Sequence, residues 1–160
     1  MDRTRDCEAC GVRTLSPQIW DGEVVCPACY FHERNLSDRL TYRESIAICE
    51  DRRICVYCGE PADEREHVVP RCANFPTWIV PACGECNRAA GGMIFDGIVA
   101  KKRHIQKALA RRYAKVLRTP EWDASELDEM GVTMRRAIAD HLAAKRIVQG
   151  RVRWRLPGEV

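Results

Sequence analysis

The sequence lacks any long apolar run, and 31% of its 160 residues are charged. A membrane-spanning helix needs about 20 consecutive apolar residues, so we expect no span and no membrane partner. The first ten residues, MDRTRDCEAC, also lack the apolar region of a secretory signal. Low-complexity tracts and an evident disordered linker are absent too. These absences favour a folded protein of the cytoplasm.

Cysteine, in contrast, is abundant, with ten residues. Disulfides are rare in a reducing compartment, which favours metal ligation. Eight cysteines form four C-x-x-C pairs, with 15 residues between the first two pairs and 24 between the last two. Two such turns complete a tetrahedral site of the structural zinc type. We therefore predict two structural zinc ions, ligated by Cys7, Cys10, Cys26 and Cys29 and by Cys55, Cys58, Cys83 and Cys86. Cys49 and Cys72 are expected to be buried, inert thiols.

Charge is unevenly distributed along the chain. Residues 1–96 hold 11 Lys and Arg against 16 Asp and Glu, whereas residues 97–160 hold 15 against 7. A basic half separated from the cysteines suggests a polyanionic partner, most often a nucleic acid. A solvated helical surface would give the same composition, so both interpretations stay open at this point.

Local patterns predict several elements. Asp21-Gly22, between apolar residues, indicates a hairpin turn. Residues 36–48 are typical of a helix, with Ser37 as a candidate cap. Beyond residue 97, apolar residues recur at helical spacing while most Lys and Arg fall elsewhere. We expect a second helical stripe to face a core, and the alternating tail RVRWRL to form a strand. The apolar residues of the second helical stripe are Leu127, Met130, Met134, Ile138 and Leu142.

Residues 55–92 carry three linked motifs: CVYCG, then EHVVPR, then VPACGECN. Together they resemble the zinc-bearing branch of the HNH endonucleases, which includes phage recombination endonucleases. The resemblance implies a ββα-metal fold in which Glu66 and Asn87 bind a catalytic divalent cation, Mg²⁺ or Mn²⁺. It also implies that His67 is the general base acting on water, and that the natural setting is a phage or mobile element.

The chemistry of phosphodiester hydrolysis fits these residue types. Carboxylate and amide oxygens are hard ligands that suit Mg²⁺, and a metal ion stabilises the charge that develops on the phosphate and leaving oxygen. An imidazole titrates near neutral pH and can accept the proton of water. The resemblance makes DNA the expected partner, and the expected phosphate contacts are Arg71, Lys101, Lys102, Arg111 and Arg112.

The expected fold class is α+β, with a small ββα-metal module held by zinc. A treble-clef or ribbon zinc finger (1–35) precedes it, joined by a linker helix (36–49). The module itself spans 50–96, and a basic helical extension with a terminal strand follows (97–160).

The alternative function is a catalytically decayed HNH scaffold that binds nucleic acid or protein. Trp78 stands where the family has its middle asparagine, and Ala90 where a lysine is common. Such an asparagine usually orients the base, and losing that kind of support can cost ten- to a hundredfold. A redox or metal-delivery protein is a third interpretation, but the C-x-x-C pairs lack the expected βαβ context.

Overall fold

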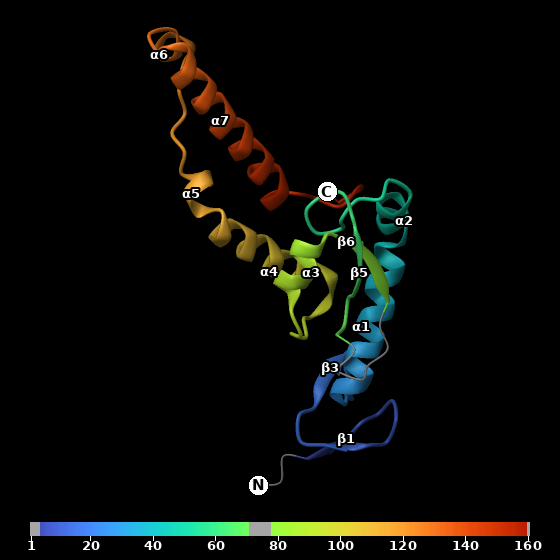
Figure 1. The fold of residues 1–160 in the computed structure, drawn as a ribbon. Coiled ribbons are helices and arrows are strands. Elements are labelled where there is room, and N and C mark those ends of the chain that lie inside the picture. The colour runs from blue at the N-terminus through green and yellow to red at the C-terminus, as the bar shows by residue number, and fades with distance from the viewer. Residues whose placement is uncertain (1–3, 71–77, 160) are drawn as a thin grey trace.

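The computed structural model describes residues 4–70 and 78–159, so the predicted contact Arg71 and the thiol of Cys72 lie outside the described residues. The fold is mixed α+β, with two-stranded sheets and helices arranged along an elongated molecule (Figure 1). The N-terminal unit carries the four cysteines of the first predicted zinc site and is termed the first zinc unit. It occupies one end of the molecule. A second unit lies in the middle, and a helical arm projects from it.

The first unit consists of a C-x-x-C turn between two short strands, termed a knuckle, followed by a hairpin and a helix. β1 (Arg5–Asp6) pairs with β2 (Arg13–Thr14) around the first C-x-x-C turn, and β3 (Gln18–Trp20) pairs with β4 (Glu23–Val25). Asp21 and Gly22 both have positive φ, at 50° and 85°. A two-residue turn of that kind matches the twist of the flanking strands, so the predicted hairpin is confirmed.

α1 (Pro27–Thr41) begins directly after Cys26, with proline in its first turn. Proline is favoured there because its φ is already helical and its missing N–H is not needed. The predicted helix over 36–48 is therefore wrong in its start, since Ser37 lies inside α1 and caps nothing. The boundary predicted between residues 35 and 36 also falls inside α1. The chain then bends at Tyr42 into α2 (Arg43–Asp51).

The second unit repeats the order of the first. A knuckle closed by an Ile54–Pro61 bridge carries the third C-x-x-C pair. β5 (Glu64–His67) then pairs antiparallel with β6 (Ile79–Ala82), and α3 (Gly84–Ala90) follows. α3 ends at Gly91, whose positive φ of 56° favours glycine. The sequence shows no long repeat, yet the same supersecondary order occurs twice.

The main core joins the second unit to α2 and to α4 (Gly97–Arg112). It includes the buried side chains of Tyr57, Val80 and Ile105, together with the four cysteines of the second unit. Because the zinc-type knuckle forms one wall of this core, the hairpin that carries Glu66 and His67 is fixed on both faces. α2 packs against β6, and α3 packs against β5.

The arm is completed by α5 (Ala114–Leu117), α6 (Ala124–Asp128) and α7 (Val132–Val152). α7 packs against α4 and α5, so its buried residues, Lys145 and Val148, lie near its C-terminal end. The predicted core stripe is wrong for this reason. Met134 is 59% exposed, and the other four members of the stripe are only half-buried.

The predicted terminal strand is also absent from the described residues. Val152 is the last residue of α7, and the chain then turns so that Leu156 enters the core at 2% exposure. The Trp154 ring lies against Gly59, where a Cβ atom would sit 2.5 Å from the ring. Gly59 also has φ +75°, so two constraints select glycine there. The alternation of RVRWRL reflects these separate contacts rather than a pleated strand.

Candidate metal centres and the Glu66–His67 hairpin

Both predicted cysteine clusters are assembled. In each group the four sulfur atoms lie within 4.8 Å of one another. Cys10 Sγ is 3.8 Å from Cys26 Sγ, and Cys58 Sγ is 3.7 Å from Cys83 Sγ. Four sulfurs at about 2.3 Å from one zinc ion form a tetrahedron with edges of about 3.8 Å. Two sites that can hold structural zinc are therefore confirmed.

Helix starts position the second pair of each cluster. Cys26 caps α1 and Cys83 caps α3, so Cys29 and Cys86 each lie in a first helical turn. Cys49, in contrast, is fully buried and lies in neither cluster. Burial raises the pKa of the Cys49 thiol to about 11, which fits the expected inert thiol.

Glu66 faces the core rather than solvent, with 5% exposure. The Tyr57 hydroxyl donates a 2.5 Å hydrogen bond to its Oε2 atom, and the Lys101 ammonium forms an ion pair with Oε1. Both carboxylate oxygens thus have a partner. That satisfies a buried charge, which is costly to leave unpaired.

Lys101 supplies a fixed positive charge beside this strand. Its side chain is fully buried, and Nζ also donates to the carbonyl oxygens of His67 and Val68, at 2.7 and 2.9 Å. Burial lowers the pKa of Lys101, and the Glu66 carboxylate opposes that shift. The Lys101 ammonium therefore contacts one carboxylate and two carbonyl oxygens. These oxygens are also the ligands that a hard metal ion prefers.

His67 lies on the other face of the strand. Successive strand residues point to opposite faces, so Arg65 and His67 share the face away from Glu66. Arg65 Nη2 is 3.3 Å from Glu50 Oε1 on α2, which identifies this as the α2 side of the sheet. His67 is paired in register with Ile79. Glu66 and His67 are neighbours in the sequence, but their side chains therefore lie on opposite faces of the strand.

Asn87 lies on α3 and meets a different carboxylate. Its Nδ2 atom donates a 2.6 Å hydrogen bond to Glu64 Oε2. Glu64 shares the face of Glu66 but is nearer to the helix start, opposite Ala82 in register. Glu64 is therefore a candidate residue that the sequence reasoning missed. The alternation of the strand, which puts residues 64 and 66 on one face, is the signal that could have found it.

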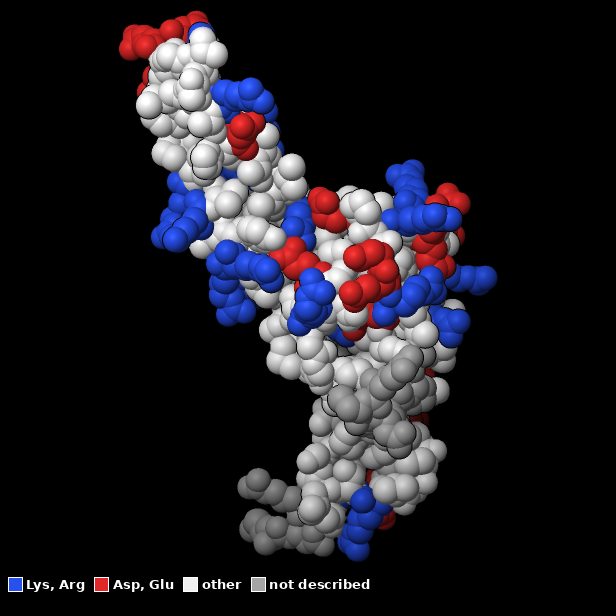
Figure 2. Space-filling model, viewed as in Figure 1, with Lys and Arg blue, Asp and Glu red and all other residues white. Residues whose placement is uncertain are grey.

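The predicted phosphate contacts divide into two groups. Lys101 and Lys102 are 0% and 4% exposed, and Lys102 forms an ion pair with Glu159. Both ammonium groups are buried against carboxylates and do not face solvent in this structure, so their predicted contact with phosphate stays a prediction. Arg112 Nε lies 3.1 Å from Glu85 Oε1, while Arg111 is exposed on α4. Figure 2 shows basic residues along the lower arm and acidic residues at its tip.

Trp78 is 8% exposed and belongs to the main core. Its backbone carbonyl accepts a hydrogen bond from the Val68 amide at 3.0 Å, which extends the hairpin by one pair. Ala90 is fully buried in the same core. Both residues therefore have a packing role in this chain.

Comparison of the chain with protein-family models, with curated proteins and with solved structures finds no match. Of the helices among residues 4–70 and 78–159, none has the length and apolar character to cross a membrane.

Proposed function

We propose that this chain is a zinc-stapled DNA endonuclease of the HNH type, which hydrolyses phosphodiester bonds to 5′-phosphate and 3′-hydroxyl ends. The second zinc unit is the observation that carries the proposal. It combines a cysteine knuckle, a hairpin with His67 at the end of β5, and a helix that carries Asn87 directly after Cys86. This order of elements supports the proposal, because a ββα-metal module has the same order.

His67 is the proposed general base. The imidazole lies at the edge of the hairpin, partly exposed, on a strand whose other face is locked by Glu66. A base held on a rigid element keeps its geometry without ordering cost. Proton transfer of this kind contributes roughly 10²–10⁴-fold to a rate.

The catalytic cation requires a rearrangement at Glu66. A bound Mg²⁺ or Mn²⁺ would supply charge neutralisation at the phosphate, and oxygens of Glu66 and Asn87 are suitable donors. Lys101 already neutralises Glu66, however, and Asn87 contacts Glu64. Glu66 becomes available only when Lys101 releases it, whereas Glu64 already lies beside Asn87.

Cleavage of supercoiled plasmid tests the proposal. Wild-type protein with Mg²⁺ or Mn²⁺ should convert the plasmid to nicked or linear forms. His67→Ala should lose activity by roughly 10²–10⁴-fold, while keeping two zinc ions, its melting temperature and DNA binding. Wild-type protein that leaves the plasmid intact with either cation, or His67→Ala that cuts at the wild-type rate, would contradict the proposed role of His67.

A matched pair of variants identifies the cation-binding carboxylate. Glu64→Gln and Glu66→Gln make the same change on the same strand face, two residues apart. The variant whose residual activity rises at higher Mg²⁺ concentration has lost a ligand. A response of Glu64→Gln alone would place the cation between Glu64 and Asn87.

The second candidate is a DNA-binding module without catalysis. The ion pair between Lys101 and Glu66 favours it, because a buried ammonium already satisfies the carboxylate that a catalytic metal would need. This candidate predicts DNA binding without cleavage at any Mg²⁺ or Mn²⁺ concentration. It also predicts no rise in melting temperature when Mg²⁺ is added.

A further inference from the structure

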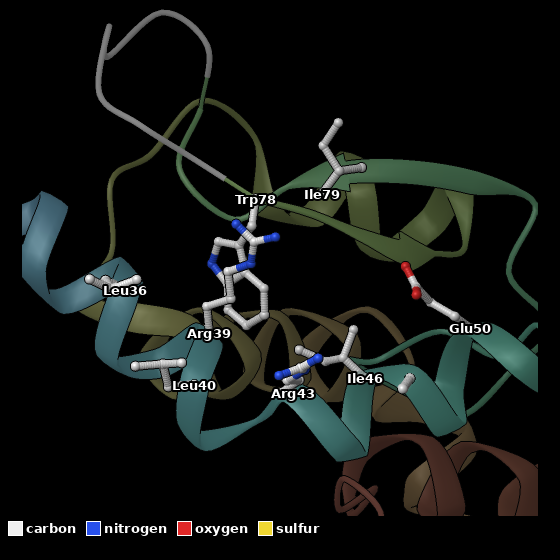
Figure 3. A pocket seen from close by; sticks show the side chains of 9 residues that line it. Leu36, Arg39, Leu40, Arg43, Ile46, Glu50, Trp78 and Ile79 are labelled. Atoms are coloured by element: carbon white, nitrogen blue, oxygen red, sulfur yellow. The ribbon is translucent and has the colours of Figure 1, made fainter.

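A groove of about 700 Å³ runs between the two helices α1 and α2 and the start of β6. Figure 3 shows residues from the helices on one side and Trp78 and Ile79 on the other. This groove lies on the α2 side of the hairpin, opposite to the face that carries Glu64, Glu66 and Asn87. None of the motif residues predicted from the sequence lines it.

Two arginines give the groove its charge. Arg39, near the end of α1, and Arg43, the first residue of α2, are both exposed and both line the groove. Within residues 4–70 and 78–159, no carboxylate forms an ion pair with either guanidinium. The one lining carboxylate, Glu50, is paired with Arg65 at 3.3 Å. Two cations are thus left for an anionic ligand.

The rest of the lining is apolar. Leu36, Leu40 and Ile79 are 45%, 66% and 42% exposed, which is unusual for large aliphatic side chains that line one groove. Trp78 forms the floor with 8% exposure. A single strand of nucleic acid matches this lining, because it offers phosphates to arginine and base faces to apolar or aromatic side chains.

The groove leads to His67. Ile79, one of its lining residues, is the cross-strand partner of His67. Side chains of directly opposite strand residues are neighbours, about 5 Å apart at Cβ. A ligand held by Arg39 and Arg43 over Ile79 would therefore pass close to the imidazole.

One hollow on the opposite side of the module is less suited to a DNA strand than this groove. The hollow beside the knuckle is lined by Glu60, Asp63 and Glu85. The arginines there are already engaged, since Arg151 Nη2 lies 2.5 Å from Glu85 Oε2. Net acidic character would repel a polyanion, so charge selects the α1–α2 groove.

We propose that the groove between α1, α2 and β6 binds a DNA strand, with Arg39 and Arg43 holding its phosphates next to His67. The inference rests on the proposed function in that DNA is the ligand, but it does not require cleavage. It assigns binding to the helices that connect the two zinc units rather than to the basic arm.

Fluorescence anisotropy with a short labelled single strand, in zinc-loaded protein without added Mg²⁺, tests this assignment. Arg39→Gln/Arg43→Gln should weaken binding about tenfold or more. Its salt slope should fall by about 1.4, because two phosphate contacts are lost at about 0.7 each. Arg39→Lys/Arg43→Lys keeps the charge and should restore most of the slope.

The matched control is Lys115→Gln/Arg118→Gln, which removes two exposed charges three residues apart on the arm. We expect it to weaken binding less than about threefold, since it removes only longer-range attraction. The inference is overturned if wild-type protein does not bind the strand, if the groove variant binds like wild type, or if the arm variant loses as much. Wild-type binding that needs the groove, without plasmid cleavage, would instead overturn the endonuclease alone.

Discussion

The two zinc units share one order of elements but differ in what surrounds the cysteines. In the first unit, Cys10 is exposed, and the buried cluster contains only Cys7, Val25 and Cys26. In the second unit all four cysteines are buried, within a cluster of 17 buried residues. The same metal-binding frame therefore serves as a nearly independent finger in one place and as part of a domain core in the other.

This difference bears on what each unit can do. A small unit whose buried apolar cluster has three residues would depend on a bound metal for folding, as zinc fingers do. The second unit adds apolar burial and a buried ion pair, so its hairpin is held by more than zinc. A rigid hairpin is what a positioned histidine requires, which is consistent with placing the proposed chemistry in the second unit.

The largest effect is expected from Cys55→Ser. Zinc contributes about 10–16 kcal/mol in zinc-finger peptides, which is comparable to the total stability of a typical domain. Because Cys55 is fully buried in the main core, losing this site should abolish cooperative unfolding of the whole protein. Thermal melting followed by circular dichroism, with zinc measured by elemental analysis, checks this. An unchanged melting temperature with two zinc ions would show that Cys55 is not a ligand.

Lys101→Met should have the next largest effect. It leaves Glu66 buried without its counter-charge, which typically costs 3–5 kcal/mol. Urea unfolding measures the loss, and Lys101→Met/Glu66→Leu should recover much of it by removing both charges.

The comparison in the first unit is Asp6→Asn, because the Asp6–Arg13 pair is exposed. The side chains of Asp6 and Arg13 are 75% and 70% exposed. Exposed pairs contribute about 0–1 kcal/mol. Equal losses in the two variants would refute the buried role of Lys101.

Asp38 joins the helix of the first unit to the main core. Its Oδ2 atom accepts a 2.7 Å hydrogen bond from the Ile98 amide at the start of α4, where Asp96 makes no side-chain cap. Gly97, lacking Cβ, leaves room for this carboxylate. Asp38→Ala should therefore cost about 1–2 kcal/mol, as lost helix caps do. Asp38→Asn keeps an acceptor and should cost less.

The pH dependence at Asp38 follows from its burial. Burial raises the pKa of the Asp38 carboxyl, although the Ile98 amide and Arg34 oppose this. The folded protein then holds this proton at a higher pH than the unfolded chain does. The contribution of Asp38 to the free energy of unfolding should therefore fall as pH rises through the window above the ordinary Asp range. Across that window the free energy of unfolding of wild type should fall relative to that of Asp38→Asn. A difference between the two that does not change with pH would contradict the raised pKa of Asp38.

Short-range rules predicted the local parts of this fold. The C-x-x-C spacing predicted both clusters, and the Asp21-Gly22 pair predicted a hairpin. Each of these depends on a few neighbouring residues with distinct backbone or ligand chemistry. The α+β class, which was expected from the resemblance, is also confirmed.

Long-range partners decided the parts that sequence reasoning missed. Lys101 and Lys102 fall between Ile98 and Ile105 on the apolar stripe of α4, so their helical positions already indicated burial. Their counter-charges, Glu66 and Glu159, are 35 and 57 residues away, and spacing along one helix cannot identify them. Arg39 and Arg43 were likewise not recognisable, because the groove forms only where α1 and α2 meet β6.

Cys10→Ser should have the smallest effect on global melting, although it removes a zinc ligand as Cys55→Ser does. Cys10 is exposed, and its unit contributes only three residues to a separate buried cluster. Loss of zinc there should unfold the knuckle and hairpin over residues 4–25 while the main core persists. Elemental analysis should give one zinc ion per chain, and the main melting transition should shift by only a few degrees. Hydrogen exchange should be fast over 4–25 and protected over 54–67. Collapse of the main transition, as in Cys55→Ser, would show that the two zinc units fold as one.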